Sequence, residues 1–253
     1  MANLLAYRVG TLHHPHLPWA TIADLGVRGV ELVWDEQTTV SAVKAAVDPA
    51  GLRVTSIHAP SPLDDARMPE ILGRHAEYAA ALGAVYLFVS VHAGDQISKQ
   101  VAYDRLRQAG DAVGRHGVYL AMETHPDLCQ NGANMNETMA GVNHPWVGVN
   151  YDTANVYYYN ENIDTVAEAT KAAHCVRGVH LKDTMGGFHD GSFPVFGEGI
   201  VDFAGVKRAL DAAGYGGPLT MELEGGAFDG VTALVLADKV SRCIGHLRRV
   251  GVV

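Results

Sequence analysis

The stretch "YLAMETHPD", residues 119–127, is an apolar run that ends in an acid and an imidazole. Its unbroken apolar start predicts a buried β-strand. Glu123 and His125 follow, although such side chains are costly to remove from water. This ending recurs along the chain at intervals of 28 to 42 residues, about the length of one βα unit. The six strand-end residues are His58, His92, Glu123, Asp152, His180 and Glu222.

The spacing of apolar residues explains this recurrence. Short β-branched or aromatic runs alternate with longer amphipathic runs, which is typical of βα units and a parallel sheet. Eight strands are predicted, at residues 4–10, 27–34, 53–59, 84–92, 117–125, 147–155, 176–183 and 219–226. Residues 67–83 predict an amphipathic helix that ends at Gly83. The last predicted helix has an apolar face formed by Leu234, Val240, Ile244 and Leu247.

Eight βα units in 253 residues match the size of a (β/α)8 barrel, and no linker rich in proline, glycine or serine divides them. We therefore predict a single TIM-barrel domain over residues 1–253. The alternative is an open doubly wound sheet, which normally carries a glycine-rich phosphate turn after its first strand. Residues 9–19 read "VGTLHHPHLPW" and lack the G-x-G-x-x-G pattern, so the barrel is favoured.

Composition restricts the partners and the compartment. Acidic residues outnumber basic ones by 28 to 19, and the net charge of −9 disfavours nucleic acid as a partner. The three cysteines, Cys129, Cys175 and Cys243, are far apart and outside any C-x-x-C motif, as in proteins of a reducing compartment. No window is apolar enough to span a membrane, and the start lacks a signal-peptide pattern. We expect a cytoplasmic protein without membrane contact.

The carboxyl ends of the strands form the face of a (β/α)8 barrel that carries chemistry. Side chains alternate along a strand, so the pairs that share a side are Glu123 with His125, His180 with Lys182, and Glu222 with Glu224. Acids gathered at one point need a cation or bound protons among them. Three carboxylates and one imidazole suit a hard divalent ion, and we predict Mn²⁺, with Mg²⁺ or Co²⁺ as alternatives.

Each of these residues also has a plainer explanation. A single acid at a strand end can cap a helix or form a surface ion pair, and His180 alone could be a hydrogen-bonded core histidine. His58 and His92 could bind only the backbone of the loops that follow them. Glu31, an acid within an apolar strand, could form a buried ion pair or contact a ligand residue, and its role stays open. The joint recurrence of the acids favours the metal site.

Five segments resemble the xylose isomerase-like barrel superfamily. They are "METHP" at 122–126, "NYDTAN" at 150–155, "GVHLKD" at 178–183, "FGEGIVDF" at 196–203 and "GYGGPLTMELEGG" at 214–226. The resemblance covers nearly the whole chain and points to the sugar isomerase/epimerase branch. That branch includes D-tagatose 3-epimerase, hydroxypyruvate isomerase and inosose dehydratase, with endonuclease IV as a more distant member.

The resemblance implies that four residues hold one divalent ion, namely Glu123, Asp152, His180 and Glu222. Glu224 is the alternative to Glu222. One departure is Asn155, which stands three residues after Asp152, where the epimerases and endonuclease IV carry a histidine. The D-x-H ligands of endonuclease IV are also missing from "FHDGSF", residues 188–193. These differences weaken the endonuclease reading and, for Asn155, the transfer of ketose epimerase activity.

The implied reaction is isomerisation or epimerisation of a small sugar, polyol-ketone or hydroxy-keto compound, by proton transfer through a metal-bound enediolate. Glu123 and Glu222 are the predicted acid/base residues, and Lys182 is predicted to protonate or orient a substrate oxygen. Lys182 could instead pair with Asp183 or Glu198. The predicted substrate-binding residues are His58, His92, His125, Asn155, His189 and Glu224.

Three other functions remain open: a lyase or dehydratase on the same site, an AP endonuclease, and a sugar-binding barrel without catalysis. The glycine-rich residues 184–199 are predicted to cover the substrate. Residues 157–159, "YYY", are predicted to stack on a sugar ring, contact another subunit or pack on a helix. The expected partner is thus a small carbohydrate-like substrate, and a homo-oligomer is compatible with the sequence.

Overall fold

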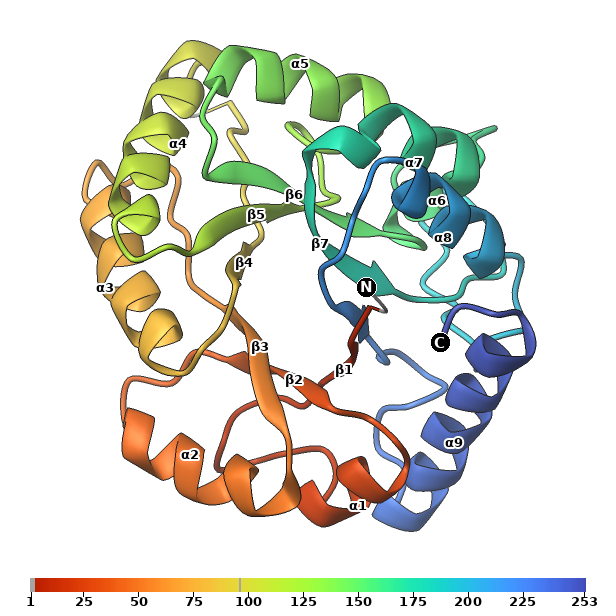
Figure 1. Ribbon diagram of the computed structural model, residues 1–253. Helices are drawn as coiled ribbons and strands as arrows, with labels where there is room; N and C mark the ends of the chain where they lie inside the picture. The colour runs from red at the N-terminus through yellow and green to blue at the C-terminus, as the bar shows by residue number, and fades with distance from the viewer. Residues whose placement is uncertain (1–2, 96) are drawn as a thin grey trace.

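Eight parallel strands close into one barrel in the computed structural model, which describes residues 3–95 and 97–253. Each strand pairs with the next in chain order, and β8 pairs with β1 (Figure 1). The strands are β1 Leu5–Arg8, β2 Gly29–Val33, β3 Arg53–His58, β4 Tyr86–Val89, β5 Tyr119–Glu123, β6 Val147–Asp152, β7 Val176–Leu181 and β8 Leu219–Met221. The predicted (β/α)8 barrel and its eight strands are confirmed.

A ring of helices surrounds the barrel (Figure 1). The α-helices are α1 Trp19–Asp24, α2 Val40–Val47, α3 Met68–Ala81, α4 Lys99–Gly114, α5 Gly132–Val142, α6 Asn155–Tyr158, α7 Thr165–Ala172, α8 Phe203–Ala212 and α9 Ala233–Arg249. Short 3-10 turns at Asp48–Ala50 and Ala173–Cys175 precede β3 and β7. Polar caps start several helices. Before α4, for example, the Ser98 side chain accepts a hydrogen bond from the Val101 N–H.

Apolar side chains fill two regions. The main core includes residues of the strands and of the helices that cover them, since both faces of a parallel barrel strand are buried. A smaller cluster consists of Tyr86, Phe88 and Ala121 on β4 and β5. The Tyr86 ring reaches the backbone of Gly178 on β7, so this cluster fills the interior of the barrel. The Phe88 ring lies beneath the polar strand ends, and its centroid is 4.6 Å from that of the His180 ring.

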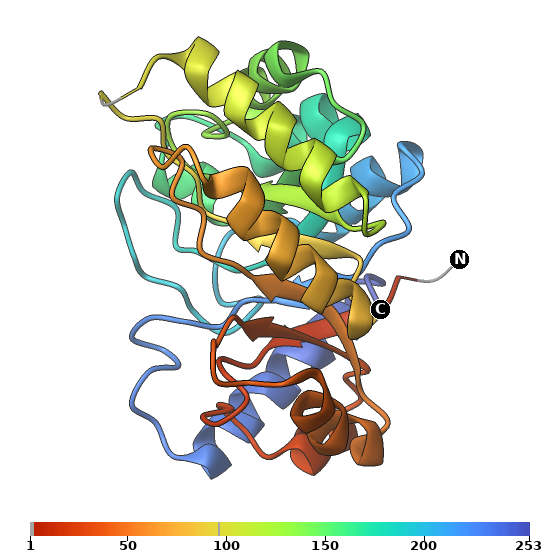
Figure 2. The ribbon, with the colours of Figure 1, turned by 90° about the vertical axis from the view of Figure 1, so that its left-hand side faces the viewer.

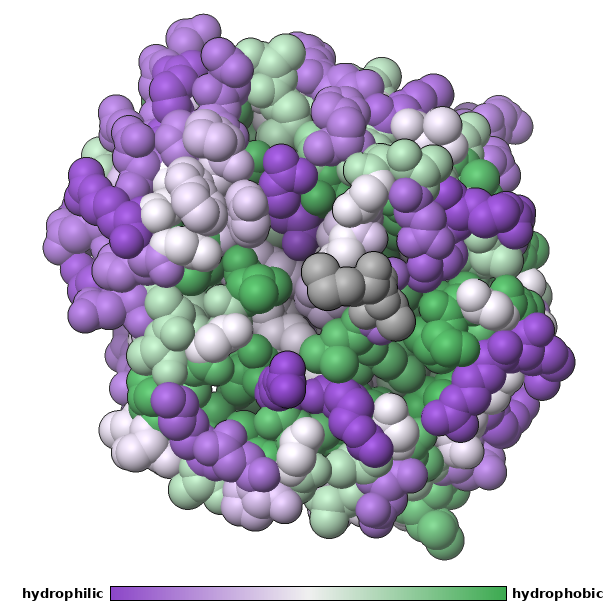
Figure 3. Space-filling view, in the orientation of Figure 1, coloured by the Kyte–Doolittle hydropathy of each residue, from purple (hydrophilic) through white to green (hydrophobic). Residues whose placement is uncertain are grey.

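The two ends of the barrel differ. Both termini lie near the amino ends of the strands, whereas the long connection between β7 and α8 extends from the opposite end (Figure 2). The amino-end face mixes hydrophilic and hydrophobic surface (Figure 3). A hollow of about 530 Å³ opens at this end, but none of the described residues that line it is acidic. The clustered acids lie at the carboxyl ends.

The apolar face predicted for the last helix holds except at its start. Val240, Ile244 and Leu247 of α9 are buried, but Leu234 is 82 % exposed. The buried face begins only at Leu236. The apolar period fixes which side of a helix faces the core, but it does not fix where along its axis the helix first meets the barrel.

Close packing inside the barrel predicts the cost of enlarging Gly178. A Cβ atom at this position would lie 2.3 Å from Asn150 Oδ1 and 2.7 Å from the Tyr86 ring. We expect Gly178→Ala to lower the free energy of unfolding by about 1–3 kcal/mol. Gly216→Ala is the matched control, because, apart from its two chain neighbours, no atom of the described residues lies within 4 Å of its added methyl group. Urea denaturation measures both, and equal stabilities would contradict the packing described.

Candidate functional site

A cavity of about 370 Å³ opens at the carboxyl ends of the strands. Its lining consists of Arg8, His58, Phe88, Ser90, Glu123, His125, Asn155, Tyr158, Tyr159, Lys182, Gly191, Phe193, Glu222 and Glu224. Charged groups from several strands therefore share this space with four aromatic rings. Gly191 and Phe193 belong to the connection that was predicted to cover the substrate, so this segment forms part of the wall.

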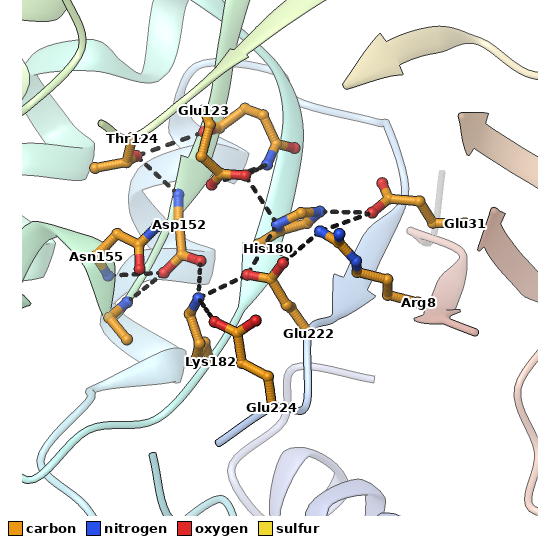
Figure 4. Close-up of polar contacts among 12 residues, drawn as sticks. Arg8, Glu31, Glu123, Thr124, Asp152, Asn155, His180, Lys182, Glu222 and Glu224 are labelled. Atoms are coloured by element: carbon orange, nitrogen blue, oxygen red, sulfur yellow. Dashed lines mark hydrogen bonds and ion pairs between the residues drawn. The ribbon is translucent and has the colours of Figure 1, made fainter. Parts of the chain in front are cut away.

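Two of the residues predicted as ligands, Glu123 and Glu222, line this cavity, and the other two, Asp152 and His180, are fully buried beside them. Glu123, Asp152 and His180 end the neighbouring strands β5, β6 and β7, and one ligand atom of each lies within 4.8 Å of the others. Glu222 joins them directly after β8. Its Oε2 and the Oε2 of Glu123 each lie 3.3 Å from His180 Nδ1 (Figure 4). Glu123, Asp152 and His180 therefore lie closely enough to share one ion, and Glu222 lies beside this group through its contact with His180.

Glu31, whose role the sequence left open, fixes the ring of His180. Nε2 of His180 lies 3.0 Å from Glu31 Oε1, and Ser56 Oγ donates a hydrogen bond of 2.7 Å to Glu31 Oε2. A carboxylate that accepts the Nε2–H orients the ring so that Nδ1 can bind a metal, as is common in metal-ligating histidines. Burial is outweighed by the carboxylates of Glu222, Glu31 and Glu123, which raise the pKa of His180 well above its usual value, so a bound cation would replace the proton on Nδ1. Nδ1 is the ring atom that faces Glu123 and Glu222 (Figure 4).

Two buried atoms in this cluster, His180 Nδ1 and Asp152 Oδ2, form no hydrogen bond of regular geometry among the described residues. Each lies in an ion pair instead, since Lys182 Nζ is 3.0 Å from Asp152 Oδ2 and carboxylate oxygens are 3.3 Å from His180 Nδ1. Both atoms fit the role of ligands to a cation. Neighbouring ligand atoms of an octahedral ion bound at about 2.1–2.3 Å lie roughly 3.0–3.3 Å apart. The 3.3 Å separations at His180 Nδ1 agree with that geometry. The residues fit a divalent ion.

Asp152 is oriented by the backbone that follows it. Its Oδ1 accepts hydrogen bonds of 2.8 Å from the N–H groups of Ala154 and Asn155, at the turn into α6. The Thr124 hydroxyl in turn accepts a hydrogen bond from the Asp152 N–H at 3.0 Å. Oδ1 is thus held by the backbone, and Oδ2 contacts the Lys182 ammonium (Figure 4).

Two side-chain cations lie among the carboxylates. Lys182 Nζ lies 3.0 Å from Asp152 Oδ2, 2.7 Å from Glu222 Oε2 and 2.8 Å from Glu224 Oε1. Arg8 Nη1 donates a hydrogen bond of 2.6 Å to the other oxygen of Glu222. Glu224, the alternative ligand, is half exposed and is paired with the Lys182 ammonium. The acids are therefore partly neutralised by the chain itself.

The acids differ in their proton affinity. Burial raises the pKa of Asp152 to about 8, even though Lys182 opposes this shift. Burial also raises the pKa of Glu123. At Glu222, burial is outweighed by the positive charges of Lys182 and His180, so its pKa lies well below the usual range. A divalent cation favours the charged form of each acid, so metal binding would release protons.

Two histidines at the cavity are held neutral. Burial, assisted by the charge of Arg8, lowers the pKa of His58 to about 4. Burial, assisted by His92 and Lys182, lowers the pKa of His125 to about 4. At pH 7 both rings are uncharged, and each can serve as a hydrogen-bond partner for an uncharged ligand.

The predicted substrate-binding residues fall into two groups. His58, His125, Asn155 and Glu224 line the cavity. The exposed ring of His92 does not. Its Nδ1 contacts the Pro126 carbonyl oxygen. His189 is also exposed and outside the lining, and its backbone N–H donates to the Tyr158 carbonyl oxygen at 2.9 Å.

Arg8 was missed by the sequence analysis. It is a charged residue that ends the first apolar strand, as Glu123 and His180 end theirs, but only acids and histidines were counted among the strand-end residues.

The alternative partners considered for Lys182 are engaged elsewhere. Asp183 accepts hydrogen bonds from backbone N–H groups of residues 197–201, and Glu198 pairs with Arg242. Asp183 thus holds the base of the connection after β7.

The chain belongs to the xylose isomerase-like TIM barrel family, whose model matches residues 19–239. Among solved structures it is similar to a D-allulose 3-epimerase from Methylomonas sp., with 16% identity over 99% of this chain and 100% of that one and a TM-score of 0.78. An L-ribulose 3-epimerase shares 18% identity over 99% and 96%, with a TM-score of 0.79. A probable 3-DHS dehydratase from Bacillus anthracis shares 18% identity over 93% and 97%, with a TM-score of 0.71.

A sequence search of curated proteins returned no match. Among residues 3–95 and 97–253, no helix combines the length and apolar character that crossing a membrane would need. The same described residues contain one group of three or more His, Cys, Asp or Glu side chains placed closely enough to share an ion, the group at the cavity.

The contact between Glu31 and His180 predicts the effect of removing the charge of Glu31. We expect Glu31→Gln to weaken the binding of Mn²⁺ or Mg²⁺ by about 10- to 100-fold, because the amide no longer fixes the His180 tautomer as a carboxylate does. Glu36→Gln serves as the control, because Glu36 is an exposed acid in the loop that follows β2. Isothermal titration calorimetry measures both affinities. Equal affinities for the two variants would show that Glu31 does not support the ligand.

Proposed function

We propose that the protein is a divalent-metal-dependent isomerase or epimerase of a small, uncharged sugar or hydroxy-keto compound. The observation that carries this proposal is the convergence of three carboxylates and one oriented imidazole in a cavity large enough for a sugar. The similarity in fold to D-allulose and L-ribulose 3-epimerases supports it. An AP endonuclease is less well supported, because the described residues contain only the one group of potential ligands.

Four residues would hold the ion: Glu123, Asp152, His180 and Glu222. We expect Mn²⁺, because carboxylate and imidazole donors suit it, with Mg²⁺ or Co²⁺ as alternatives. A bound ion of this kind stabilises negative charge on substrate oxygens, which makes a carbon next to a carbonyl acidic enough to lose a proton.

Glu123 is the better placed proton acceptor. It lines the cavity, and its hydrogen bonds within the described residues are long ones from the Asn150 side chain, at 3.4 and 3.5 Å. Burial raises the pKa of Glu123, whereas a bound ion would lower it. Glu123 would therefore remove the proton from the substrate.

Glu222 and Lys182 would act together on the other side of the site. Both oxygens of Glu222 are bound by cations, Oε1 by Arg8 and Oε2 by Lys182. This keeps Glu222 ionised, so a proton returned from this side would come from the Glu222–Lys182 pair. The Lys182 ammonium is the group that would donate to a substrate oxygen.

The charge of the cavity favours a neutral substrate. Five carboxylates surround the site, and two side-chain cations with one divalent ion leave the balance negative. The carboxylates are Glu31, Glu123, Asp152, Glu222 and Glu224. The aromatic rings of Tyr158, Tyr159 and Phe193 offer flat apolar surface to the carbon skeleton of a sugar.

A dehydratase on the same site is the second candidate. The observation that favours it is the Lys182 ammonium, which is placed to protonate a departing hydroxyl group. The similarity in fold to a probable 3-DHS dehydratase agrees with this. Incubation of the metal-loaded protein with ketoses in D₂O separates the two reactions. Deuterium in an intact sugar indicates isomerisation or epimerisation, whereas net loss of water indicates the dehydratase.

Replacement of Glu123 tests the proposed reaction. We expect Glu123→Gln to lower kcat by about 10²- to 10⁴-fold, since the amide cannot accept the proton. Glu77→Gln, an exposed acid on α3, should leave kcat unchanged. Turnover of ketoses such as D-allulose and L-ribulose, with metal content measured in parallel, provides the readout. Full turnover by metal-loaded Glu123→Gln would overturn the assignment, and no turnover by the unaltered protein would favour a binding barrel.

The negative balance of the cavity predicts discrimination against charged substrates. We expect kcat/KM for a ketose phosphate to be at least about 10-fold lower than for the free ketose, because like charges oppose each other in a desolvated site. A ketose that carries an uncharged substituent of similar size on the same hydroxyl is the control. It shows how much of any loss in kcat/KM comes from the size of the phosphate and how much from its charge. A phosphate ester that is turned over faster than the free sugar would contradict the predicted substrate class.

A further inference from the structure

Arg8 contacts two cavity residues at once. Its Nη1 donates a hydrogen bond of 2.6 Å to Glu222 Oε1, and its Nη2 lies 3.0 Å from Nδ1 of His58. The guanidinium also lies over the Phe88 ring, 5.2 Å from its centroid. The Arg8 side chain is 20 % exposed, so these contacts are formed largely out of water. A single planar group therefore links the ends of β1, β3 and β8.

The contact with Arg8 decides which nitrogen of His58 carries the proton. A guanidinium has five N–H donors and no acceptor, and it stays charged at any ordinary pH. Nδ1 of His58 must therefore be the acceptor in the 3.0 Å contact. A neutral imidazole whose Nδ1 accepts carries its hydrogen on Nε2. The low pKa of His58, caused by burial and then by Arg8, agrees with a neutral ring.

The His58 ring is also fixed in position. It packs against Phe88, with ring centroids 4.5 Å apart, and Phe88 in turn packs against His180. His58 lines the cavity together with Glu222 and Glu123, and the hydrogen bonds among residues 3–95 and 97–253 include none at its Nε2. The Nε2–H is therefore the ring group of His58 that is left available to a ligand in this cavity.

We propose that Arg8 is a positioning residue that directs the Nε2–H of His58 toward a carbonyl or hydroxyl oxygen of the substrate, while it holds Glu222 in place. This inference rests on the proposed function for the identity of the acceptor. A neutral N–H fixed in advance stabilises negative charge that develops on oxygen and does not surrender its proton. His58 is therefore a donor in the reaction and not its base.

The position of the proton on His58 is measurable without any activity. The full chain, labelled with ¹⁵N-histidine and loaded with diamagnetic Mg²⁺, is examined by NMR, and His58→Gln identifies the signals of this ring. We expect the unaltered protein to show a protonated Nε2 and a bare Nδ1. In Arg8→Met the two tautomers should mix. Arg53→Met, at the exposed start of β3, should leave the His58 signals unchanged.

Arg8→Lys separates the two contacts of Arg8. It also provides the test if Arg8→Met fails to fold. The lysine ammonium keeps a positive charge near Glu222. It lacks the second nitrogen with which the guanidinium of Arg8 reaches His58. We expect metal affinity to be retained, the His58 tautomers to mix and kcat to fall about 10- to 100-fold, with a smaller change in KM.

Two results would overturn the proposal. One is a proton on Nδ1 of His58 in the unaltered protein. The other is an unchanged tautomer in Arg8→Lys together with unchanged kcat. If the unaltered protein turned over no sugar, the proposed function would fail, but the NMR comparison would still decide whether Arg8 sets the His58 tautomer.

Discussion

The site depends on the burial of several carboxylates at one end of the barrel. Their mutual repulsion and their loss of hydration both oppose folding unless positive charge lies among them. Lys182 and Arg8 supply part of that charge, and they do so asymmetrically, because both contact Glu222. Glu123 and Asp152 keep raised pKa values, even though Lys182 pairs with Asp152. The remaining demand for positive charge is what makes the site suited to a divalent ion.

The barrel holds the polar residues of the site in fixed positions. The polar residues stand at the ends of hydrogen-bonded strands, and most are held by a neighbour: His180 by Glu31, Asp152 by the backbone of α6, and Glu222 by Arg8. Phe88 separates this layer from the apolar interior below it. A (β/α)8 barrel places eight strand ends around one point, so side chains far apart in the sequence can share an ion.

Membership of the xylose isomerase-like TIM barrel family establishes the scaffold, but such a scaffold hosts several reactions. The chemistry is decided by which acid can take a proton and which group can return one. Here Glu123 contacts Asn150 and His180, whereas Glu222 is bound by the side-chain cations of Arg8 and Lys182. In the proposed reaction this asymmetry would let Glu123 remove the proton and the Glu222–Lys182 pair act on a substrate oxygen, in either an isomerisation or a dehydration.

The sequence by itself determined the eight strands and the recurrence of acids and histidines at their ends, because strand period and βα length are local properties of the chain. From this the barrel followed, as did the gathering of Glu123, Asp152, His180 and Glu222. Only the tertiary structure decided that Glu31 orients His180, that Lys182 pairs with three acids, and that Arg8 reaches both Glu222 and His58. Some of these contacts join strands that are not neighbours in the sheet, such as β2 with β7 and β1 with β3, and the contact of Arg8 with Glu222 depends on closure of β8 onto β1. Lys182, directly after β7, pairs with acids of the adjacent strand ends. The partners of these side chains depend on register and side-chain reach, which no local pattern encodes.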